Sequence, residues 1–275
     1  MQRLLRAIGI LLLHIPPLTI PFISTGKTAW IAFLVSFVAM QFAICGGLHR
    51  FFAHRSFETS RTFQFLIALM GASCFGDPIG FSGRHRLHHK NSDTALDFHG
   101  PRHGVWFGWF GHLLEDGFSE DELGSVTRDL TKYPELVWLH RWTWVPGIAA
   151  MTLICLAGGF ALFATAYCLS WCIVVHGSSA VNYFCHKGTH QRYATGDRSS
   201  NNVWLALLML GEGWHNNHHH YPSAARAGVF WYEIDVLYYI LKALSWIGLV
   251  WNLHEIPDSY ESGRSGKPLD SRAIL

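Results

Sequence analysis

The chain has 275 residues, of which 50% are hydrophobic, and its mean hydropathy is +0.17. This composition is too apolar for an ordinary soluble domain and indicates a protein of the lipid bilayer. The formal net charge of +2 gives no reason to expect a nucleic-acid partner. The 18 histidines stand out, whereas the six cysteines form no Cys-x-x-Cys pair and are interpreted as reduced, structural residues.

Four apolar segments predict membrane-spanning helices, because their lengths approach what the hydrocarbon core requires. They cover residues 4–23, 28–48, 143–158 and 160–181. The first follows two arginines and precedes no clear small-residue cleavage site, which favours a spanning helix over a signal peptide. Gly158-Gly159 is the natural turn between the last two segments.

The remaining segments, 49–141 and 186–275, are mostly polar and predict a helical cap on one side of the membrane. Lys27 is the only one of the 21 Lys and Arg residues that this topology places on the other side. By the positive-inside rule, the cap and both termini then face the cytoplasm. The sequence therefore predicts an all-α integral membrane protein with a single domain, residues 1–275.

The sequence supports a more specific prediction for three segments of this cap. Residues 63–75 are apolar but too short to cross, so we expect a membrane-surface or re-entrant segment. Residues 229–251 contain two acidic residues and a lysine, which favours an amphipathic helix at the membrane surface over a fifth span. The tail, residues 254–275, is rich in Ser, Gly, Asp and Arg and is predicted to be disordered.

The histidines gather in three boxes. Two of them share the spacing His-x-x-His-His, at residues 85–89 and 215–219, and the third is the pair His49 and His54. A helix advances about 100° per residue, so each His-x-x-His-His box places its three imidazoles on one face. His49 and His54 would be turned about 140° from each other and would suit two neighbouring metals better than one. A purely structural role remains the alternative for any single histidine.

The number of imidazoles narrows the choice of metal. Imidazole suits Fe, Cu, Zn and Ni, but a zinc hydrolase typically uses three protein ligands, and eight histidines would overfill such a site. Two iron ions would use the whole set. A redox centre beside a bilayer could oxidise a C–H bond of a lipid chain.

The boxes also have a recognisable form. Residues 48–56, 84–90 and 211–219 resemble the three histidine boxes of the membrane fatty acid desaturases, most closely the acyl-CoA Δ9 branch in its bacterial form. The resemblance implies two iron ions and O2-dependent formation of a cis double bond in a saturated acyl-CoA or other acyl carrier. It also implies membrane lipids as surroundings, a bacterial inner-membrane location, and a separate electron donor such as ferredoxin or cytochrome b5 with its reductase.

The resemblance extends the candidate site. Asn182 and His186 match a family pattern in which the histidine is a ligand and the asparagine reaches a metal through water; on a helix they share a face. No catalytic residue is expected apart from the metal ligands. Asp97 and Glu212 are candidates to orient imidazoles, with helix caps or surface pairs as alternatives. The expected ligands are His49, His54, His85, His88, His89, His186, His215, His218, His219 and Asn182.

Three aromatic residues, Phe81, Trp109 and Trp214, are candidate walls of an acyl tunnel, with core packing as the alternative. Two positions depart from the animal enzymes. Glu115-Asp116 stands where those enzymes have a basic pair for the CoA phosphates, and Phe81 replaces a tryptophan. Acyl chain length, bond position and acyl carrier are therefore left open.

Two other functions are considered. A lipid or alkane hydroxylase would use similar histidine boxes and insert oxygen rather than remove a second hydrogen. A metal transporter or sensor is disfavoured because ion pathways place their ligands within the spans, near the midplane, whereas these boxes lie at the span ends or outside them.

Overall fold

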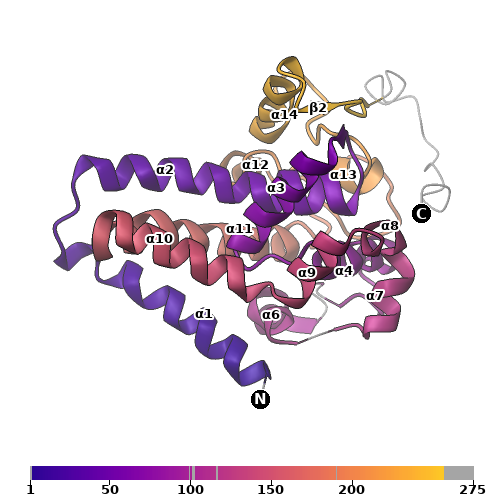
Figure 1. Ribbon diagram of the computed structural model, residues 1–275. Coiled ribbons are helices and arrows are strands. Elements are labelled where there is room, and N and C mark those ends of the chain that lie inside the picture. Colours follow the sequence, from indigo (N-terminus) through magenta and orange to yellow (C-terminus); the bar gives the residue numbers. More distant parts are fainter. Residues whose placement is uncertain (1, 99, 101–102, 116, 190, 257–275) are drawn as a thin grey trace.

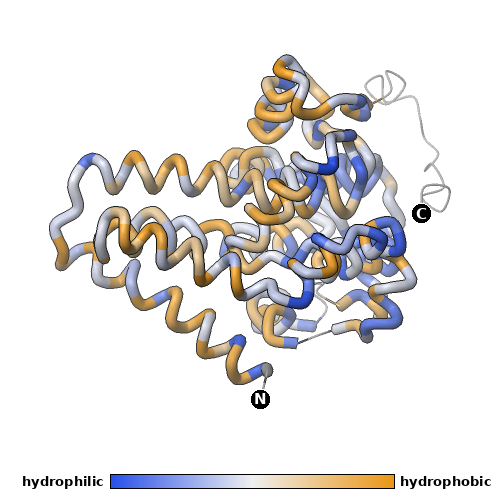
Figure 2. Tube along the Cα trace, in the orientation of Figure 1, coloured by the Kyte–Doolittle hydropathy of each residue, from blue (hydrophilic) through white to orange (hydrophobic). Residues whose placement is uncertain are grey.

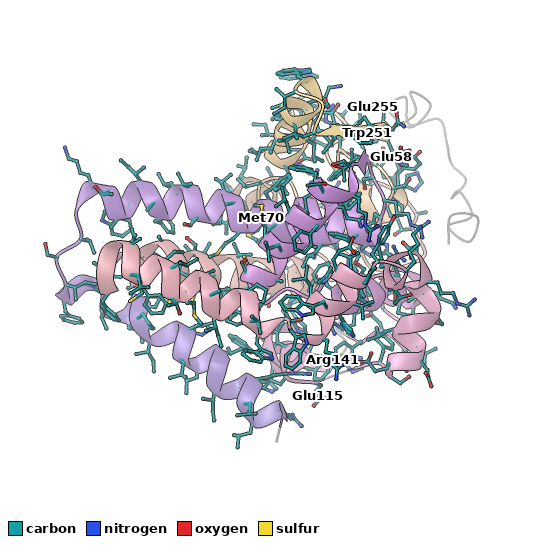
Figure 3. All side chains as sticks on the ribbon, in the orientation of Figure 1. Glu58, Met70, Glu115, Arg141, Trp251 and Glu255 are labelled. Carbon is teal, nitrogen blue, oxygen red and sulfur yellow. The ribbon has the colours of Figure 1, made fainter. Side chains whose placement is uncertain are left out.

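The computed structural model describes residues 2–98, 100, 103–115, 117–189 and 191–256, which are mainly helical (Figure 1). Long helices extend to one side of the molecule, and shorter helices pack together at their ends. The only sheet in these ranges is a ribbon of two residues per strand, β1 (Glu58–Thr59) and β2 (Val250–Trp251), which pair antiparallel. Trp251 Nε1 donates to Glu58 Oε2 across this ribbon at 3.1 Å (Figure 3).

Three helical stretches of the described chain are long and apolar enough to cross a membrane: Arg3–Phe22, Lys27–Ala53 and Trp144–Phe184. Their outward faces carry large apolar side chains, and Leu156 is 80% exposed. Figure 2 shows these helices as mainly hydrophobic along their length. Such uncovered apolar surface suits lipid rather than water.

The stretch Trp144–Phe184 is interrupted at the expected turn. It comprises α10 (Trp144–Leu162), the π-helical η5 (Phe163–Leu169) and α11 (Ser170–Phe184), and Gly158 and Gly159 have non-helical backbone angles. Gly147 packs against the ring of Phe75, and Trp171 Nε1 donates to the carbonyl of the adjacent Cys74. A straight helix would separate residues 147 and 171 by about 36 Å. The chain therefore reverses direction at the two glycines.

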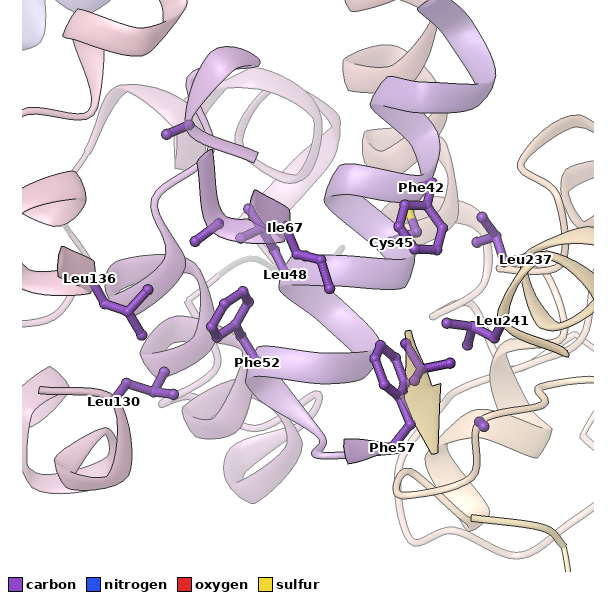
Figure 4. Packing of buried hydrophobic residues seen from close by; sticks show 14 of the residues in the cluster. Phe42, Cys45, Leu48, Phe52, Phe57, Ile67, Leu130, Leu136, Leu237 and Leu241 are labelled. Atoms are coloured by element: carbon purple, nitrogen blue, oxygen red, sulfur yellow. The ribbon is translucent and has the colours of Figure 1, made fainter. Parts of the chain in front are cut away.

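The helix of the second predicted span runs further than residue 48. α1 (Gln2–Leu18) and the short η1 (Ile20–Phe22) lead to α2 (Lys27–Gln41), which continues without a break into the π-helical η2 (Phe42–Ala53). η2 is largely buried and lies in the main hydrophobic core, where Leu48 and Phe52 pack among side chains from distant segments (Figure 4). The first histidine box therefore lies at the end of a helix that is long and apolar enough to cross a membrane.

Two helices meet at a sharp bend after η2. α3 (Arg61–Ser73) and α4 (Pro78–Asn91) are inclined at 86°, and Asp77 caps α4 by accepting from the N–H of Ile79. α3 agrees with the short apolar segment expected over residues 63–75. The chain then continues through α5 (Gly104–Trp106), η4 (Phe107–Gly111), α6 (His112–Leu114), α7 (Glu120–Val126), α8 (Arg128–Thr131) and α9 (Pro134–Arg141).

The prediction for residues 229–251 was wrong in its extent. After α12 (Val203–Leu208) and α13 (His215–His220), the helix α14 covers only Val236–Trp246. Glu233 and Asp235 are fully buried and bind other parts of the chain, so they do not form the polar face of a surface helix.

The predicted start of the disordered tail also needs correction. His254 accepts from the N–H of Ala225 and donates its own N–H to Ser56, and Glu255 accepts from the hydroxyl of Tyr238. These residues are therefore fixed by long-range hydrogen bonds. The rest of the predicted tail, residues 257–275, lies outside the described residues.

Candidate metal centre

The second histidine box lies on the last two turns of α4. His85 and His89 are one turn apart on the same face, and their Nε2 atoms are 3.0 Å apart. His88 is rotated away from His89 by about 100° and faces a different set of partners. The bend at Asp77 directs this end of α4 back against η2.

The third box forms α13, a helix of only six residues. The turn that leads into α13 depends on two glycines. Gly211 has a φ of +124°, which L side chains rarely adopt, and a Cβ at Gly213 would overlap the backbone of Ala206 and Asn202. The close packing of this turn against the start of α12 leaves His215, at the start of α13, facing inward and buried.

The first box corrects the helical estimate made from the sequence. Because η2 is π-helical, the N–H of His54 donates to the carbonyl of His49 at 3.1 Å, and the two imidazole centroids lie 4.9 Å apart. An i to i+5 hydrogen bond brings both side chains to one face. The expectation that His49 and His54 serve two different metals was therefore wrong.

The structure brings together all nine predicted histidines in two groups. Within each group one nitrogen of every imidazole lies within 4.8 Å of the others. Each His-x-x-His-His box is divided, with its i, i+4 pair in one group and its middle histidine in the other. Cluster 1 contains His49, His54, His85, His89 and His218, and cluster 2 contains His88, His186, His215 and His219.

The hydrogen bonds of cluster 2 leave lone pairs facing one another. His186 and His219 place Nδ1 at 2.9 and 2.7 Å from Asp93 and Asp197, so in their neutral forms Nε2 carries no proton. Both Nε2 atoms lie near His215 Nε2, at 2.9 and 3.1 Å. A single proton on His215 can satisfy only one of them, whereas a cation between the three nitrogens satisfies all.

Cluster 1 also brings three Nε2 atoms close together. His218 Nε2 lies 3.0 Å from His49 Nε2 and 3.1 Å from His89 Nε2. Two ligands at right angles on a metal with bonds of about 2.1 Å would be about 3.0 Å apart, and tetrahedral ligands about 3.4 Å. The observed spacing therefore fits a metal of more than four ligands better than structural zinc.

Protonation does not explain the close contacts of five of these imidazoles. Burial, and then the neighbouring imidazoles, lower the pKa of His54, His89, His215 and His218 well below the usual range. Burial also lowers the pKa of His219 to about 4, although the hydrogen bond to Asp197 opposes this shift. Neutral imidazoles are the form that binds metals.

Both carboxylates predicted to orient imidazoles contact a cluster. Asp97 Oδ1 accepts from His88 Nδ1 at 2.9 Å, and Glu212 Oε2 lies 2.7 Å from His49 Nδ1. Both side chains are buried. Each carboxylate fixes the ring so that Nε2 points into its cluster.

Two further carboxylates with this role were missed by the sequence analysis. Asp93 accepts from His186 Nδ1, and Asp197 accepts from His219 Nδ1. The spacing of Asp93 four residues before Asp97, directly after the second box, was a usable signal. Asp197 lies in a loop far from any box in sequence, and only the tertiary structure reveals its role.

A buried ionic network supports the first and third boxes. Arg50 donates to Glu212 at 2.7 Å and to Asp235 at 2.9 Å, and both carboxylates are almost inaccessible. Burial raises the pKa of Glu212, but His49 and Arg50 together lower it to about 2. Asp235, one of the two acidic residues assigned to a surface helix from the sequence, therefore fixes Arg50 beside the first and third boxes.

The polar residues within the third box bind other segments of the chain rather than the clustered histidines. Asn216 Oδ1 accepts from the N–H groups of Arg192 and Tyr193. Asn217 donates to Glu233 at 3.0 Å and accepts from Asn201. These amides attach α13 to the segment that carries Asp197.

The remaining predicted residues, Asn182 and the three aromatic side chains, differ in their contacts. Asn182 is half-buried on α11, one turn before His186, and its role through water stays a prediction. Phe81 stacks on His85 with centroids 5.9 Å apart. Trp109 donates to His176 Nδ1, and Trp214 is buried and donates to the carbonyl of Ile234. Their place in an acyl tunnel also stays a prediction.

Comparison with known proteins identifies the family. The model of the family described as "Fatty acid desaturase" matches residues 28–251. The chain belongs to the fatty acid desaturase family. The match begins at the second apolar helix and includes all nine clustered histidines, so the metal centre lies within the shared region.

Curated relatives of this desaturase act on different acyl carriers. The chain is 34% identical to an acyl-CoA 5-desaturase of Anemone leveillei, over 86% of this chain and 75% of that protein. It is also 34% identical to an icosanoyl-CoA 5-desaturase of Limnanthes douglasii (90% and 71%) and to an sn-1 stearoyl-lipid 9-desaturase of Anabaena variabilis (81% and 82%). The chain is therefore an oxidoreductase of lipid metabolism.

Proposed function

We propose that this desaturase introduces a cis double bond, at Δ9, into a saturated acyl chain, using O2 and two iron ions. The observation that carries the proposal is the pair of buried imidazole clusters in a desaturase-family chain. Δ9 selectivity is supported by the form of the boxes and by the 9-desaturase relative, which is matched over a greater share of its length than the two 5-desaturases above.

The ligands would be the nine clustered histidines, with Asn182 acting through water. When bound, the iron pair would supply the activation of O2 and the oxidation of an unactivated C–H bond. The chain's own residues have three tasks: their Nε2 atoms bind, their Nδ1 contacts orient the rings, and burial excludes water from the centre. Selectivity among equivalent methylenes depends on positioning, for which Phe81, Trp109 and Trp214 are the candidates.

The proposed topology has four spans, with Trp144–Phe184 supplying two. The reversal at Gly158-Gly159 supports it, because it returns the chain to the side on which α10 begins. The positive-inside rule then places both termini and the metal centre in the cytoplasm of a bacterial cell, with the spans in the inner membrane. A separate donor, such as ferredoxin or cytochrome b5, would deliver electrons there.

The acyl carrier is the least constrained part of the proposal. Glu115, at the position where animal enzymes have a basic residue, forms an ion pair with Arg3 of α1 at 3.0 Å. An acidic side chain there would repel a CoA pyrophosphate. Acyl-CoA and acyl-lipid are therefore both offered in the test.

The test is turnover by the purified, iron-loaded protein with O2, a reductant and an electron-donor protein. Stearoyl and palmitoyl groups are supplied as CoA esters and as membrane lipids, and products are analysed by mass spectrometry. We expect loss of two hydrogens and a cis bond at Δ9. Iron-replete protein that leaves every carrier unchanged would contradict the proposal.

The same measurement separates the two enzyme alternatives, and a flux assay tests for a transporter. Gain of one oxygen would identify a hydroxylase, and a double bond at another position would retain the desaturase but reject Δ9. A transporter would move metal into proteoliposomes, and this flux would survive loss of His88 and His89.

A further inference from the structure

The two clusters differ in the charge behind their imidazoles. In cluster 2, three of the four imidazoles place Nδ1 within 2.9 Å of an aspartate: His88 with Asp97, His186 with Asp93, and His219 with Asp197. All three aspartate side chains are at most 9% exposed.

Cluster 1 has a different environment. His49 lies near Glu212, but that carboxylate is shared with the guanidinium of Arg50 at 2.7 Å. The rings of His54, His89 and His218 are surrounded by other histidines in the part of the chain that is described. Among the ion pairs of the described residues, cluster 1 therefore has one carboxylate, which is partly neutralised by Arg50, where cluster 2 has three.

The three aspartates are held in place by further hydrogen bonds. Asp97 accepts from the N–H of Asp93, and Asp93 accepts from the N–H of Arg198. Asp197 accepts from the hydroxyl groups of Thr195 and Ser199. These contacts hold the carboxylates oriented toward the imidazoles.

A carboxylate on Nδ1 makes an imidazole a stronger ligand, and loss of such a partner typically weakens metal binding by about 10- to 100-fold. Negative charge near a metal also stabilises its more highly charged, oxidised state. All three aspartates lie beside cluster 2, so all three strengthen metal binding there and stabilise the oxidised state of that metal.

We propose that Asp93, Asp97 and Asp197 are positioning residues that make the two metal sites unequal. Cluster 2 binds its metal more tightly than cluster 1 and holds it oxidised at a lower reduction potential. This inference rests on the proposed iron-binding function, and it assigns the difference to charge behind the ligands rather than to their number.

The experiment is release of iron from the full-length purified protein by increasing chelator, with iron measured by mass spectrometry. We expect two phases in the native protein. Asp97→Asn and Asp197→Asn each keep a hydrogen-bond acceptor but remove the charge, so each should weaken only the tighter phase, by about 10- to 100-fold. Mössbauer spectra of ⁵⁷Fe-loaded protein are recorded during stepwise reduction. The native protein should show one iron reduced before the other. Each variant should raise the reduction potential of the iron that is reduced second.

The matched control is Asp77→Asn. Asp77 Oδ2 also accepts from a histidine Nδ1, at 2.8 Å, but that histidine, His140, lies in neither cluster. This variant should release iron as the native protein does.

Each outcome is decisive. Release of both irons in one phase from the native protein would overturn the inference without the need for any variant. Two phases that are unchanged in Asp97→Asn and Asp197→Asn, or equally changed in Asp77→Asn, would also overturn it. Native protein that binds no iron at all would instead contradict the proposed function.

Discussion

At the scale of single residues, two adjacent histidines in each long box serve different clusters. His88 and His89 are neighbours in sequence, yet the first contacts Asp97 and cluster 2, whereas the second faces His218 and cluster 1. One helix turn thus contributes to both sites. Substituting one imidazole should therefore affect one metal more than the other.

We expect His218→Ala to abolish turnover while the protein still inserts in the membrane. His218 Nε2 lies between the Nε2 atoms of His49 and His89, so its loss removes a central ligand of cluster 1. Iron content should fall toward one per chain, measured by mass spectrometry of the purified variant.

The comparison variant is His220→Ala. His220 lies outside both clusters and stacks on Tyr193 with centroids 4.1 Å apart. This variant should retain its iron and its turnover. Full activity in His218→Ala would remove that residue from the centre.

His140 predicts a pH dependence of stability. The hydrogen bond to Asp77 raises the pKa of His140 to about 9, burial opposes the shift, and Glu120 contributes. A group whose pKa rises on folding stabilises the folded state fully below its unfolded pKa of 6.5 and loses that contribution as pH rises through about 9. We therefore expect the unfolding temperature in detergent to fall over this interval.

The His140→Gln variant provides the control, because glutamine does not titrate. Its unfolding temperature should be lower than that of the native protein near pH 6.5, and the difference should shrink toward pH 9. A difference that stays constant with pH would contradict the assignment to His140.

At the scale of elements, departures from regular α-helix decide how the site is assembled. The π-helical η2 aligns His49 with His54, and the bend between α3 and α4 directs the second box toward them. π-Helical segments are rare and often occur at functional sites. In η2 the π-helical turn places His49 and His54, which are five residues apart, on one face.

The break in Trp144–Phe184 can be tested by Gly159→Ala. Gly159 has φ +68° and ψ −168°, a conformation that is almost restricted to glycine, so alanine should destabilise the protein by about 1–3 kcal/mol. Denaturant unfolding in detergent would measure the loss. Gly9→Ala on α1 is the control, because a Cβ there meets nothing within 4 Å and should not destabilise. Equal stability of the two variants would argue against the strained turn.

At the scale of the whole molecule, the fold joins lipid-facing helices to a polar metal centre. α2 and η2 are one continuous helix whose first part has exposed apolar side chains and whose last part carries His49. The candidate metal centre therefore lies at the end of helices that are apolar enough to cross a membrane. A chain in the bilayer and a soluble electron donor could both approach it.

The proposed topology predicts opposite accessibility of the two ends of these helices. We expect Lys27→Cys to react with a membrane-impermeant maleimide in intact cells. Asp121→Cys, on exposed α7, should react only after permeabilisation. The native protein gives the background from its own six cysteines. Reaction of both variants in intact cells would exclude the proposed orientation.

The residues alone were enough to predict the spacing of the boxes, the apolar helices and the turn at Gly158-Gly159. These features depend on side-chain type and short-range periodicity, which are visible in the residues. The resemblance to the family was also visible in the sequence, because the histidine boxes are local motifs.

The division of the histidines between two clusters is visible in the three-dimensional structure and could not be predicted from the sequence. The π-helical turn between His49 and His54 arises where η2 is packed within the core, and the partnership of Asp197 with His219 joins two separate segments. The burial of Glu233 and Asp235 likewise follows from contacts with Arg192 and Arg50. Such contacts connect residues that are up to 185 positions apart, and no local pattern encodes them.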